Sequence, residues 1–300
     1  MSAGTRAQFL ALAGLKGKAP IVMLTAYDAP GAAAAAEGGV DVLLVGDSAA
    51  TVVLGYTSTR EIALDELLML TRAVRRGAPG LPLVGDMPWG SYEASDAVAV
   101  QTARRFVDEA GCDAVKLEGA GEIVARVRAI VAAGVPVIGH VGLLPQAART
   151  EADFRAKGRS AEEAVQIVHD GEALAAAGIT LLVAEAMPPR VGAELAARVA
   201  VPVIGIGAGA AVDGQVLVFH DLLGLTAGHV PRFVRRYASL REESVEAIRS
   251  WSEDVRAGRF PEPAESYGMA ADEEGRFVTL LRVTRPDAED ATDQADGAAG

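Results

Sequence analysis

The sequence predicts a single (β/α)8 barrel, and three observations carry that prediction. Eight short apolar runs recur along the 300 residues, and most are separated by segments long enough to form a helix. The residues are 50% hydrophobic yet only 5% aromatic, a composition that suits buried parallel strands covered by Ala-rich helices. Two of the runs, GVPVIGH at 134–140 and AVPVIGI at 200–206, nearly repeat each other. A doubly wound sheet also alternates strands and helices, but usually with fewer strands, so the number of runs favours the barrel.

The predicted elements follow one another in the order that a barrel requires. We expect strands at 21–26, 42–46, 81–85, 114–117, 135–139, 179–184, 201–206 and 215–219. The clearest helical segments between them are 63–76, 94–109, 122–133, 160–177 and 190–199. Several of these are followed by a glycine that suits a left-handed cap: Gly77, Gly111, Gly134 and Gly178. Ser160 and Glu163 have the spacing of a capping box, in which both side chains accept backbone N–H groups.

Both ends of the chain carry segments beyond the eight units. Residues 5–14 are expected to form an extra N-terminal helix over the barrel floor. After the last strand we expect C-terminal helices at 231–240 and 242–257 and a strand at 274–283. Residues 286–300 hold five acids and no base, which is typical of a disordered tail. The predicted organisation is a catalytic barrel at 1–260, an extension at 261–285 and an acidic tail at 286–300.

Charge and composition exclude several classes of protein. The formal net charge is −12, and without the five tail acids the body still carries −7 (−12 + 5), so no nucleic-acid partner is expected. No apolar run reaches the roughly 18 residues that cross a bilayer, and the N-terminus does not read as a secretory signal. Cys112 is the one cysteine, so no intrachain disulfide is expected, and it should be a small buried apolar residue. We therefore expect a cytoplasmic protein without a membrane partner.

Carboxylates follow several of the predicted strands, at the barrel end where active sites lie. Asp47, Asp86 and Glu118 follow the second, third and fourth runs, each beside Gly or Ser. Any one of them alone is more often a helix N-cap or an ion-pair partner. Three buried carboxylates at one mouth are costly without a cation, and an all-oxygen donor set suits Mg²⁺. The sequence therefore predicts a divalent metal site at these three residues.

Other polar side chains at the strand ends are candidates for substrate contact. Lys116, two residues before Glu118, faces the same side of its strand, where it pairs with a substrate carboxylate, neutralises Glu118 or forms a Schiff base. Ser48 either donates a hydrogen bond beside the metal site or caps the next segment. His140 ends the fifth run, and both a substrate contact and an ordinary structural histidine remain open for it. GIGAG at 205–209 suits either a phosphate or close packing.

Glu185 ends a very apolar run and stands apart from the predicted metal ligands. Apolar surroundings raise the pKa of a carboxyl group and make it a better base. The alternative is an ion pair with a nearby arginine. We expect Glu185 to accept a proton from the substrate.

A series of strings along residues 20–260 resembles the ketopantoate hydroxymethyltransferase family. The strings, in chain order, are TAYD (25–28), VGDS (45–48), TRAVRRGAP (71–79), DMPWGSY (86–92), DAVKLEG (113–119), GHVGLLPQ (139–146), PVIGIGAG (202–209) and DGQVLVFHDLLGL (213–225). The resemblance implies a (β/α)8 barrel, a homodecamer and bound Mg²⁺. It also implies transfer of a hydroxymethyl group from 5,10-methylenetetrahydrofolate to 3-methyl-2-oxobutanoate, giving 2-dehydropantoate for pantothenate biosynthesis.

The matching strings also imply roles for individual residues. Asp47, Asp86 and Glu118 are expected to be the metal ligands, and Glu185 falls where the family keeps its proton acceptor. Lys116 is expected to assist catalysis. The expected substrate contacts are Asp47, Ser48, Asp86, Lys116 and His140.

Two segments depart from the usual pattern of the family. After GHVGLLPQ the sequence reads AARTEADFRAKGR (147–159), which keeps only Gly158 and Arg159 of a segment that usually runs from Gly-Gly-Tyr to Gln-Gly-Lys/Arg. After VGDS, Thr57 stands where the family usually has an acid. These changes leave open a related enzyme that hydroxymethylates a different 2-oxo acid.

Two further functions are alternatives. A Mg²⁺-dependent C–C lyase or mutase of the same barrel superfamily has a similar acidic cluster, usually with a reactive cysteine in a loop, whereas Cys112 precedes a strand. A non-enzymatic scaffold protein has no need of a metal cluster, a lysine and a separate base at one mouth.

Overall fold

The computed structural model describes residues 3–150, 153–228 and 230–283, and at its centre a closed barrel joins eight strands in chain order. Each strand pairs with its neighbours in parallel, and β8 closes the barrel by pairing with β1. The strands are β1 (Ile21–Thr25), β2 (Val42–Val45), β3 (Leu83–Asp86), β4 (Ala114–Lys116), β5 (Val137–Gly142), β6 (Leu181–Glu185), β7 (Val203–Ile206) and β8 (Gly214–Leu217). The predicted (β/α)8 barrel is confirmed.

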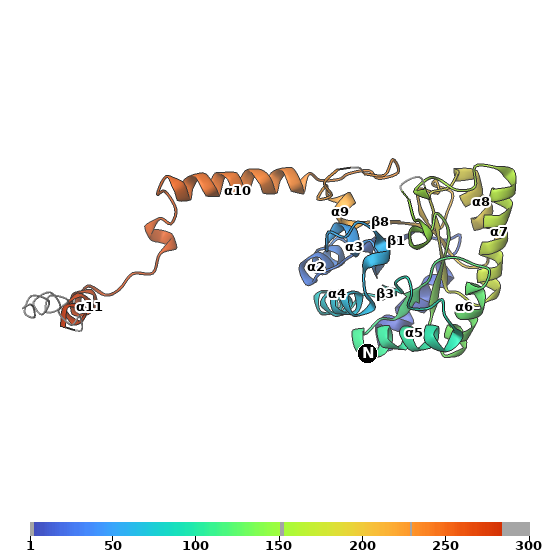
Figure 1. Ribbon diagram of the computed structural model, residues 1–300, viewed down its shortest axis with the longest axis horizontal. Helices are drawn as coiled ribbons and strands as arrows, with labels where there is room; N and C mark the ends of the chain where they lie inside the picture. Colours follow the sequence, from blue (N-terminus) through green and yellow to red (C-terminus); the bar gives the residue numbers. More distant parts are fainter. Residues whose placement is uncertain (1–2, 151–152, 229, 284–300) are drawn as a thin grey trace, which may run out of the picture. The chain divides into compact units, whose positions relative to one another are not determined.

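Helices follow one another around the outside of the barrel (Figure 1). Each packs against the next in the series α2 (Ala29–Glu37), α4 (Leu64–Gly77), α5 (Asp96–Ala110), α6 (Ile123–Ala132), α7 (Ala161–Ala176) and α8 (Pro189–Arg198). Short helices lie in the loops: α3 (Ala49–Val52), η2 (Thr59–Glu61), η3 (Pro145–Ala147) and α9 (Phe219–Leu222). Gly85 in β3 allows one close contact, since a Cβ there would lie 2.3 Å from the Phe106 ring of α5.

Two apolar cores hold this arrangement together. The outer core lies between the strands and the surrounding helices. The inner core fills the barrel with at least one side chain from each of the eight strands and is closed from below by Phe9 and Leu12. These two residues belong to α1 (Ala3–Ala11) and η1 (Leu12–Leu15), so the extra N-terminal helix predicted at 5–14 is confirmed.

The helix ends agree with the sequence predictions in part. Gly111 ends α5 in the left-handed conformation with φ 73°, and Gly134 and Gly178 are also left-handed. The prediction for Gly77 is wrong: it is the last residue of α4, and a Cβ there would lie 2.2 Å from the backbone oxygen of Ala29. Glycine is therefore required there by a close approach of α4 to α2.

Only half of the predicted capping box forms. The Ser160 hydroxyl accepts the N–H of Glu163 as expected. The Glu163 carboxylate, however, accepts the N–H of Arg159 instead of that of Ser160. The helix start is still capped, but the acid holds the chain one residue earlier.

Two predictions beyond the barrel are wrong. Residues 231–239 form no helix, because their backbone groups bond to α9 and the turn after it: Tyr237 N donates to Leu222 O at 2.8 Å and Leu240 N to Leu223 O at 3.0 Å. The strand predicted at 274–283 is part of α11 (Ala271–Val283), in which three acids occupy the first turn and Arg282 the last, as the helix dipole favours. The helix predicted at 242–257 is present as α10 (Leu240–Arg256).

The chain divides into two compact units, Met1–Arg241 and Glu242–Gly300. The first contains the barrel, and the second contains most of α10, the short helix η5 (Pro263–Glu265) and α11. The domain boundaries at 260 and 285 stay a prediction, and the tail at 286–300 lies outside the described residues. Within the described ranges, no helix has both the length and the apolar character that a membrane span needs.

Candidate active site

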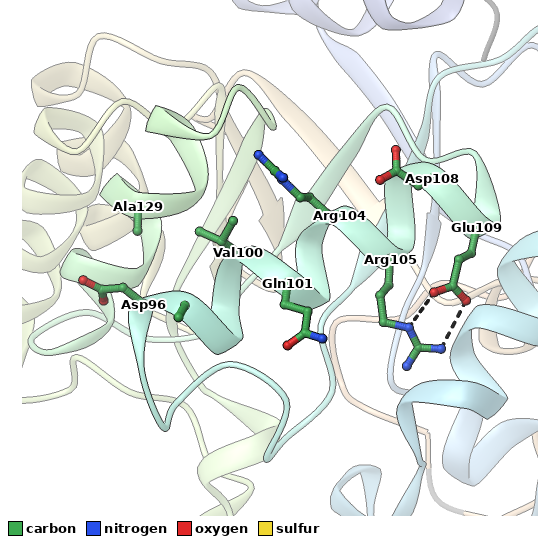
Figure 2. Close-up of a pocket in the computed structure, with 9 residues that line it drawn as sticks. Asp96, Val100, Gln101, Arg104, Arg105, Asp108, Glu109 and Ala129 are labelled. Atoms are coloured by element: carbon green, nitrogen blue, oxygen red, sulfur yellow. Dashed lines mark hydrogen bonds and ion pairs between the residues drawn. The ribbon is translucent and has the colours of Figure 1, made fainter.

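A cavity of about 1100 Å³ opens at the carboxyl ends of the barrel strands. Its lining includes every residue that the sequence singled out for the site: Asp47, Ser48, Asp86, Lys116, Glu118, His140 and Glu185. A second hollow, of about 590 Å³, lies along the outer face of α5 (Figure 2). Its charged side chains are largely exposed, and Arg105 there is already paired with Glu109 at 2.6 Å. The barrel mouth is therefore the candidate site.

Asp86 and Lys116 form a buried ion pair at the floor of the cavity. The Lys116 ammonium donates to both carboxylate oxygens of Asp86, at 2.7 and 2.8 Å. The second of these oxygens also accepts the backbone N–H of Asp47 at 3.1 Å. Parallel pairing of β3 with β4 places Asp86 and Lys116 side by side, which explains the contact. The lysine is thus bound mainly to Asp86, whereas the protein partner that its spacing suggested was Glu118, which is more distant at 3.5 Å.

Glu118, His140 and Glu185 form a second chain of contacts. His140 Nδ1 lies 3.4 Å from Glu118 Oε1, and His140 Nε2 lies 3.3 Å from Glu185 Oε2. Neither contact has hydrogen-bond geometry. Both ring nitrogens of His140 and Glu118 Oε1 therefore have no hydrogen-bond partner among the described residues. Lys116 Nζ is 3.5 Å from Glu118 Oε1 and so connects the two groups. The imidazole therefore lies between a predicted metal ligand and the predicted base.

Gln146 and Tyr92 hold Glu118 in place, although the sequence analysis assigned neither a role. Gln146 N donates to Glu118 Oε2 at 3.0 Å, and its side-chain amide donates to Met87 O at 3.0 Å. Tyr92 OH donates to Gln146 Oε1 at 2.8 Å. Tyr92 is the last residue of the string DMPWGSY, and Gln146 is the last residue of GHVGLLPQ. A polar side chain at the end of each string was the signal in the sequence that could have identified them.

Ser48 is bound to Tyr27 instead of capping a helix. The two hydroxyl oxygens lie 2.8 Å apart, and the Ser48 side chain makes no capping bond to α3. The Tyr27 ring also contacts the His220 ring, with centroids 5.4 Å apart. The serine hydroxyl therefore lines the cavity with a partner behind it.

Electrostatic interactions at the floor are dominated by crowded carboxylates. Burial raises the pKa of Asp47 well above its usual range, and Asp86 and Glu118 raise it further. Burial also raises the pKa of Asp86 against the opposing effect of Lys116. Burial acts to raise the pKa of Glu118, but Lys116 and His140 outweigh it and the pKa is lowered. The carboxylate of Asp47 thus has too little positive charge nearby to offset its burial.

His140 and Lys116 respond to the same carboxylates. Burial acts to lower the pKa of His140, but Glu118 and Glu185 outweigh it and raise that pKa to about 9. Burial also acts to lower the pKa of Lys116, and Asp86 with Glu118 raises it above its usual range. Both groups are therefore cationic at neutral pH in this arrangement.

The donor chemistry of the floor fits a hard divalent cation. Asp47 Oδ2 and Glu118 Oε1 are buried with no hydrogen-bond partner among the described residues, which is costly for carboxylate oxygens. In the described parts of the chain, no three His, Cys, Asp or Glu side chains are arranged closely enough to hold an ion as they stand. Lys116 explains this, since its ammonium occupies both oxygens of Asp86. The oxygens suit Mg²⁺, and binding requires Lys116 to release at least one of them.

Glu185 is positioned by an unusual backbone conformation. It ends β6 with its side chain 15% exposed, so its surroundings are only partly apolar. The next residue, Ala186, has φ 47°, the one positive φ of a non-glycine residue in the described chain. Ala186 O accepts the N–H of Lys157 at 2.8 Å, and Ala186 N donates to Ile206 O. Glu185 is thus connected through Ala186 to the loop after residue 152 and to β7.

Cys112 is buried directly before β4, as predicted. Burial raises the pKa of its thiol above the usual range. It is not among the residues that line the cavity. A reactive loop cysteine is therefore not supplied by this residue.

Comparisons with known proteins show which family the chain resembles. The family profile of ketopantoate hydroxymethyltransferase matches residues 6–263. The chain is 49% identical over 254 residues to the 3-methyl-2-oxobutanoate hydroxymethyltransferase of Geobacillus kaustophilus, covering 85% of this chain and 91% of that protein. It is 48% identical over 257 residues to the enzyme of the same name from Oleidesulfovibrio alaskensis, covering 86% and 89%.

Among solved structures, two barrels are similar in fold. The phosphoenolpyruvate phosphomutase of Streptomyces platensis subsp. rosaceus has a TM-score of 0.59 at 18% identity, covering 93% of this chain and 96% of that one. A phosphonopyruvate hydrolase in complex with oxalate and Mg²⁺ has a TM-score of 0.56 at 14% identity, covering 93% and 97%. At 18% and 14% identity, the similarity to these two structures shows a shared fold alone.

Proposed function

Since this chain belongs to the ketopantoate hydroxymethyltransferase family and is an enzyme of the transferase class, we propose that it hydroxymethylates 3-methyl-2-oxobutanoate. In this reaction, 5,10-methylenetetrahydrofolate supplies the one-carbon unit, water supplies its oxygen, and the products are 2-dehydropantoate and tetrahydrofolate. The observation that supports it most is the separation of carboxylates within one cavity. Glu118, which Lys116 connects to Asp86, lies at Nδ1 of His140, and Glu185 lies at Nε2.

The first part of the proposal is the binding of the 2-oxo acid. Asp47 and Asp86 hold magnesium, and Glu118 completes the site with its unpartnered oxygen. Bound magnesium supplies the positive charge that polarises the keto group and stabilises the enolate. Lys116 and the Ser48 hydroxyl bind the carboxylate of the substrate, since both line the cavity beside these residues.

The second part is the removal of a proton. Glu185 accepts the C3 proton of the acid, and the resulting enolate carbon bonds to the methylene carbon of the folate. The two bonds from that carbon to the folate nitrogens break, water supplies the hydroxyl group, and tetrahydrofolate leaves. A positioned base typically contributes about 10²–10⁴-fold to such a step. His140, 3.3 Å from Glu185 Oε2, orients the carboxylate and keeps its second oxygen free for the substrate.

Isotope exchange tests the proton step separately from the transfer. The protein is incubated with Mg²⁺ and 3-methyl-2-oxobutanoate in heavy water without folate, and the C3 proton is followed by NMR. We expect exchange that Glu185→Gln lowers by at least about 10²-fold, with Arg104→Gln on the outer face of α5 as the control. Adding the folate then yields 2-dehydropantoate. Absence of exchange with 3-methyl-2-oxobutanoate and with a panel of other 2-oxo acids would contradict the proposal.

A related acceptor is the second candidate, and one observation favours it. The segment that departs from the family pattern contributes Phe154, Arg155, Ala156 and Arg159 to the cavity lining. A different wall can admit a different side chain on the 2-oxo acid. Exchange that is faster with a homologue than with 3-methyl-2-oxobutanoate in the same panel identifies this case.

We also propose that the protein works in the cytoplasm as a homo-oligomer, a decamer by its family. The apolar side chains exposed on α10, including Ile248 and Trp251, support an assembly. No nucleic acid or membrane is required by the proposed reaction.

A further inference from the structure

The mouth of the cavity differs in charge from its floor. The floor carries the carboxylates of Asp47, Asp86, Glu118 and Glu185. The mouth is lined by three exposed arginines, Arg155, Arg159 and Arg232. Within the described residues, their guanidinium groups make no ion pair or hydrogen bond. Three unpaired cations around one opening are notable in a chain of net charge −12.

Some other arginines near the barrel have partners, whereas Arg76, Arg104 and Arg128 on the outer helices have none among the described residues. Arg75 is bound to Asp113 at 2.7 Å, and Arg198 to Glu194 at 2.7 Å. Arg60 donates to Gln146 O and stacks on Trp89 at 3.9 Å from the ring centroid. The three mouth arginines have no such partner and, unlike the unpaired arginines of the outer helices, they line the cavity, where they are free to bind an anion.

Apolar side chains adjoin these arginines in the lining. Phe154, 51% exposed, precedes Arg155, and Phe233 follows Arg232. Phe233 packs over Gly207, where a Cβ would lie 2.6 Å from the ring. Pro188 and Pro189 contribute a further rigid wall. The mouth thus combines flat apolar surfaces with guanidinium groups, which suits a ligand that has both an aromatic ring and carboxylates.

Backbone hydrogen bonds shape the two segments that carry the arginines, and the first segment is also bound to the end of β6. Lys157 N donates to Ala186 O at 2.8 Å, which fixes the first segment beside Glu185. Val234 N donates to Pro231 O at 3.0 Å, which forms the turn that presents Arg232. Arg155, Arg159 and Arg232 therefore occupy defined positions, although the two segments are far apart in the sequence.

We infer that Arg155, Arg159 and Arg232 bind the γ-glutamyl carboxylates of the folate co-substrate. This inference rests on the proposed function and adds a subsite to it. The tail of a reduced folate carries an α-carboxylate on each γ-linked glutamate and one terminal γ-carboxylate. The acidic floor repels this tail and the arginine mouth attracts it, so the pterin end with its methylene carbon enters towards Glu185. Arginine matches a carboxylate with two parallel N–H groups, which lysine cannot do.

The test compares donors with one and with five γ-linked glutamates. For the intact protein with Mg²⁺ and 3-methyl-2-oxobutanoate, we expect a lower KM for the pentaglutamyl form. In Arg155→Gln/Arg159→Gln/Arg232→Gln, the KM for the pentaglutamyl form should rise about ten- to a hundredfold. Each exposed ion pair that is lost raises the KM about two- to fivefold, and three are lost. The KM for the monoglutamyl form should rise less than the KM for the pentaglutamyl form, because exposed rim charges act mainly on binding of the tail.

A matched control removes three other exposed arginines. Arg76→Gln/Arg104→Gln/Arg128→Gln lowers the positive charge equally on α4, α5 and α6, which lie outside the cavity lining. We expect it to keep the KM values of the parent and its preference for the pentaglutamyl form. Equal KM values for the two donors in the parent protein, or an equal rise in both triple variants, would overturn the inference.

A binding experiment keeps the inference testable if no transfer is observed. Pentaglutamyl tetrahydrofolate is titrated calorimetrically into the parent protein and both triple variants, with penta-γ-glutamate and tripolyphosphate as competitors. Binding that only the mouth variant loses supports the arginine subsite even where the proposed reaction fails. Unchanged binding in that variant, or competition by tripolyphosphate as strong as by penta-γ-glutamate, rejects a carboxylate-specific site.

Discussion

Gln146 connects more of the site than any residue that the sequence analysis assigned a role. Its backbone N–H holds Glu118, and its buried side chain joins Met87 O to the Tyr92 hydroxyl. In Gln146→Leu, which keeps a similar volume, Met87 O loses this donor, and the Tyr92 hydroxyl keeps only its longer bond to Glu118 O at 3.5 Å. We expect a loss of about 2–4 kcal/mol in the free energy of unfolding, since each buried polar group left unpaired costs about 1–3 kcal/mol.

Denaturant unfolding of a double-mutant cycle checks this value. Tyr92→Phe removes one of the two bonds, so Gln146→Leu should cost less in that background than in the parent chain. The exchange rate of the C3 proton should also fall in Gln146→Leu, because the lost side-chain bonds position the backbone N–H that Glu118 accepts. Fully additive free energies for the two substitutions would contradict a shared hydrogen bond.

At the scale of single residues, the sequence identified types of chemistry more readily than contacts. Strand ends in a parallel barrel share one mouth, so the positions of Asp47, Asp86, Glu118 and Glu185 in one cavity could be predicted. The bond from Lys116 to Asp86 depends on the register of β3 against β4, which spacing along one strand cannot reveal. The position of His140 between Glu118 and Glu185 likewise depends on the pairing of β5 with β6.

Elements at the base of the barrel are tied together by Asp213, which lies between β7 and β8. Its carboxylate accepts the ammonium of Lys16 at 2.7 Å, the N–H of Val203 at 2.8 Å and the N–H of Gly17 at 3.0 Å. Burial acts to raise the pKa of Asp213, but Lys16 and the two N–H groups outweigh it and the pKa is lowered. The N-terminal segment and two strands therefore depend on one ionised side chain.

Asp213→Asn is expected to lower the free energy of unfolding by about 1–3 kcal/mol at pH 7, because an amide cannot accept all three donors. A carboxylate whose pKa is lowered by folding stabilises above its unfolded pKa, about 3.9, and loses that contribution as the pH falls through the folded value. The difference between parent and variant should therefore be complete at pH 7 and narrow below about pH 4. Urea unfolding at pH 7 and 3.5 measures it, and a difference that widens in acid would contradict this account.

At the scale of elements, the sequence predicted the strands and helices that bury an apolar face. It did not predict the segments whose conformation depends on tertiary hydrogen bonds or on charged side chains. The strands and the helices α4 to α8 follow from periodicity and turn residues. Residues 231–239 are irregular because their N–H groups bond to the segment around α9, a tertiary effect without a local pattern. In α11, β-branched and aromatic residues suggested a strand, but acids in the first turn and the Glu273–Arg276 pair favour a helix.

At the scale of the whole molecule, the second unit has an apolar face on α10 that the described residues of that unit leave exposed. On α10, Val245, Ile248, Trp251 and Val255 recur three to four residues apart, and all are between 42% and 61% exposed. No residue of α10 or α11 is buried. Burial of such a face contributes roughly 25 cal/mol per Å² of apolar surface, so a second copy of the chain is favoured as its partner.

We therefore expect light scattering after size exclusion to give a mass that is a multiple of 30.9 kDa. Ile248→Glu/Trp251→Glu places two charges on the apolar face of α10 and should lower that mass, because unpaired charges in an interface cost several kcal/mol. Ala247→Glu/Ser250→Glu adds the same charge to α10 off that face and should leave the mass unchanged. Trp251 provides an independent signal: its fluorescence should shift to longer wavelength when dilution separates the copies. A monomeric parent protein would contradict the assembly, and an unchanged mass in both variants would place the interface elsewhere than on α10.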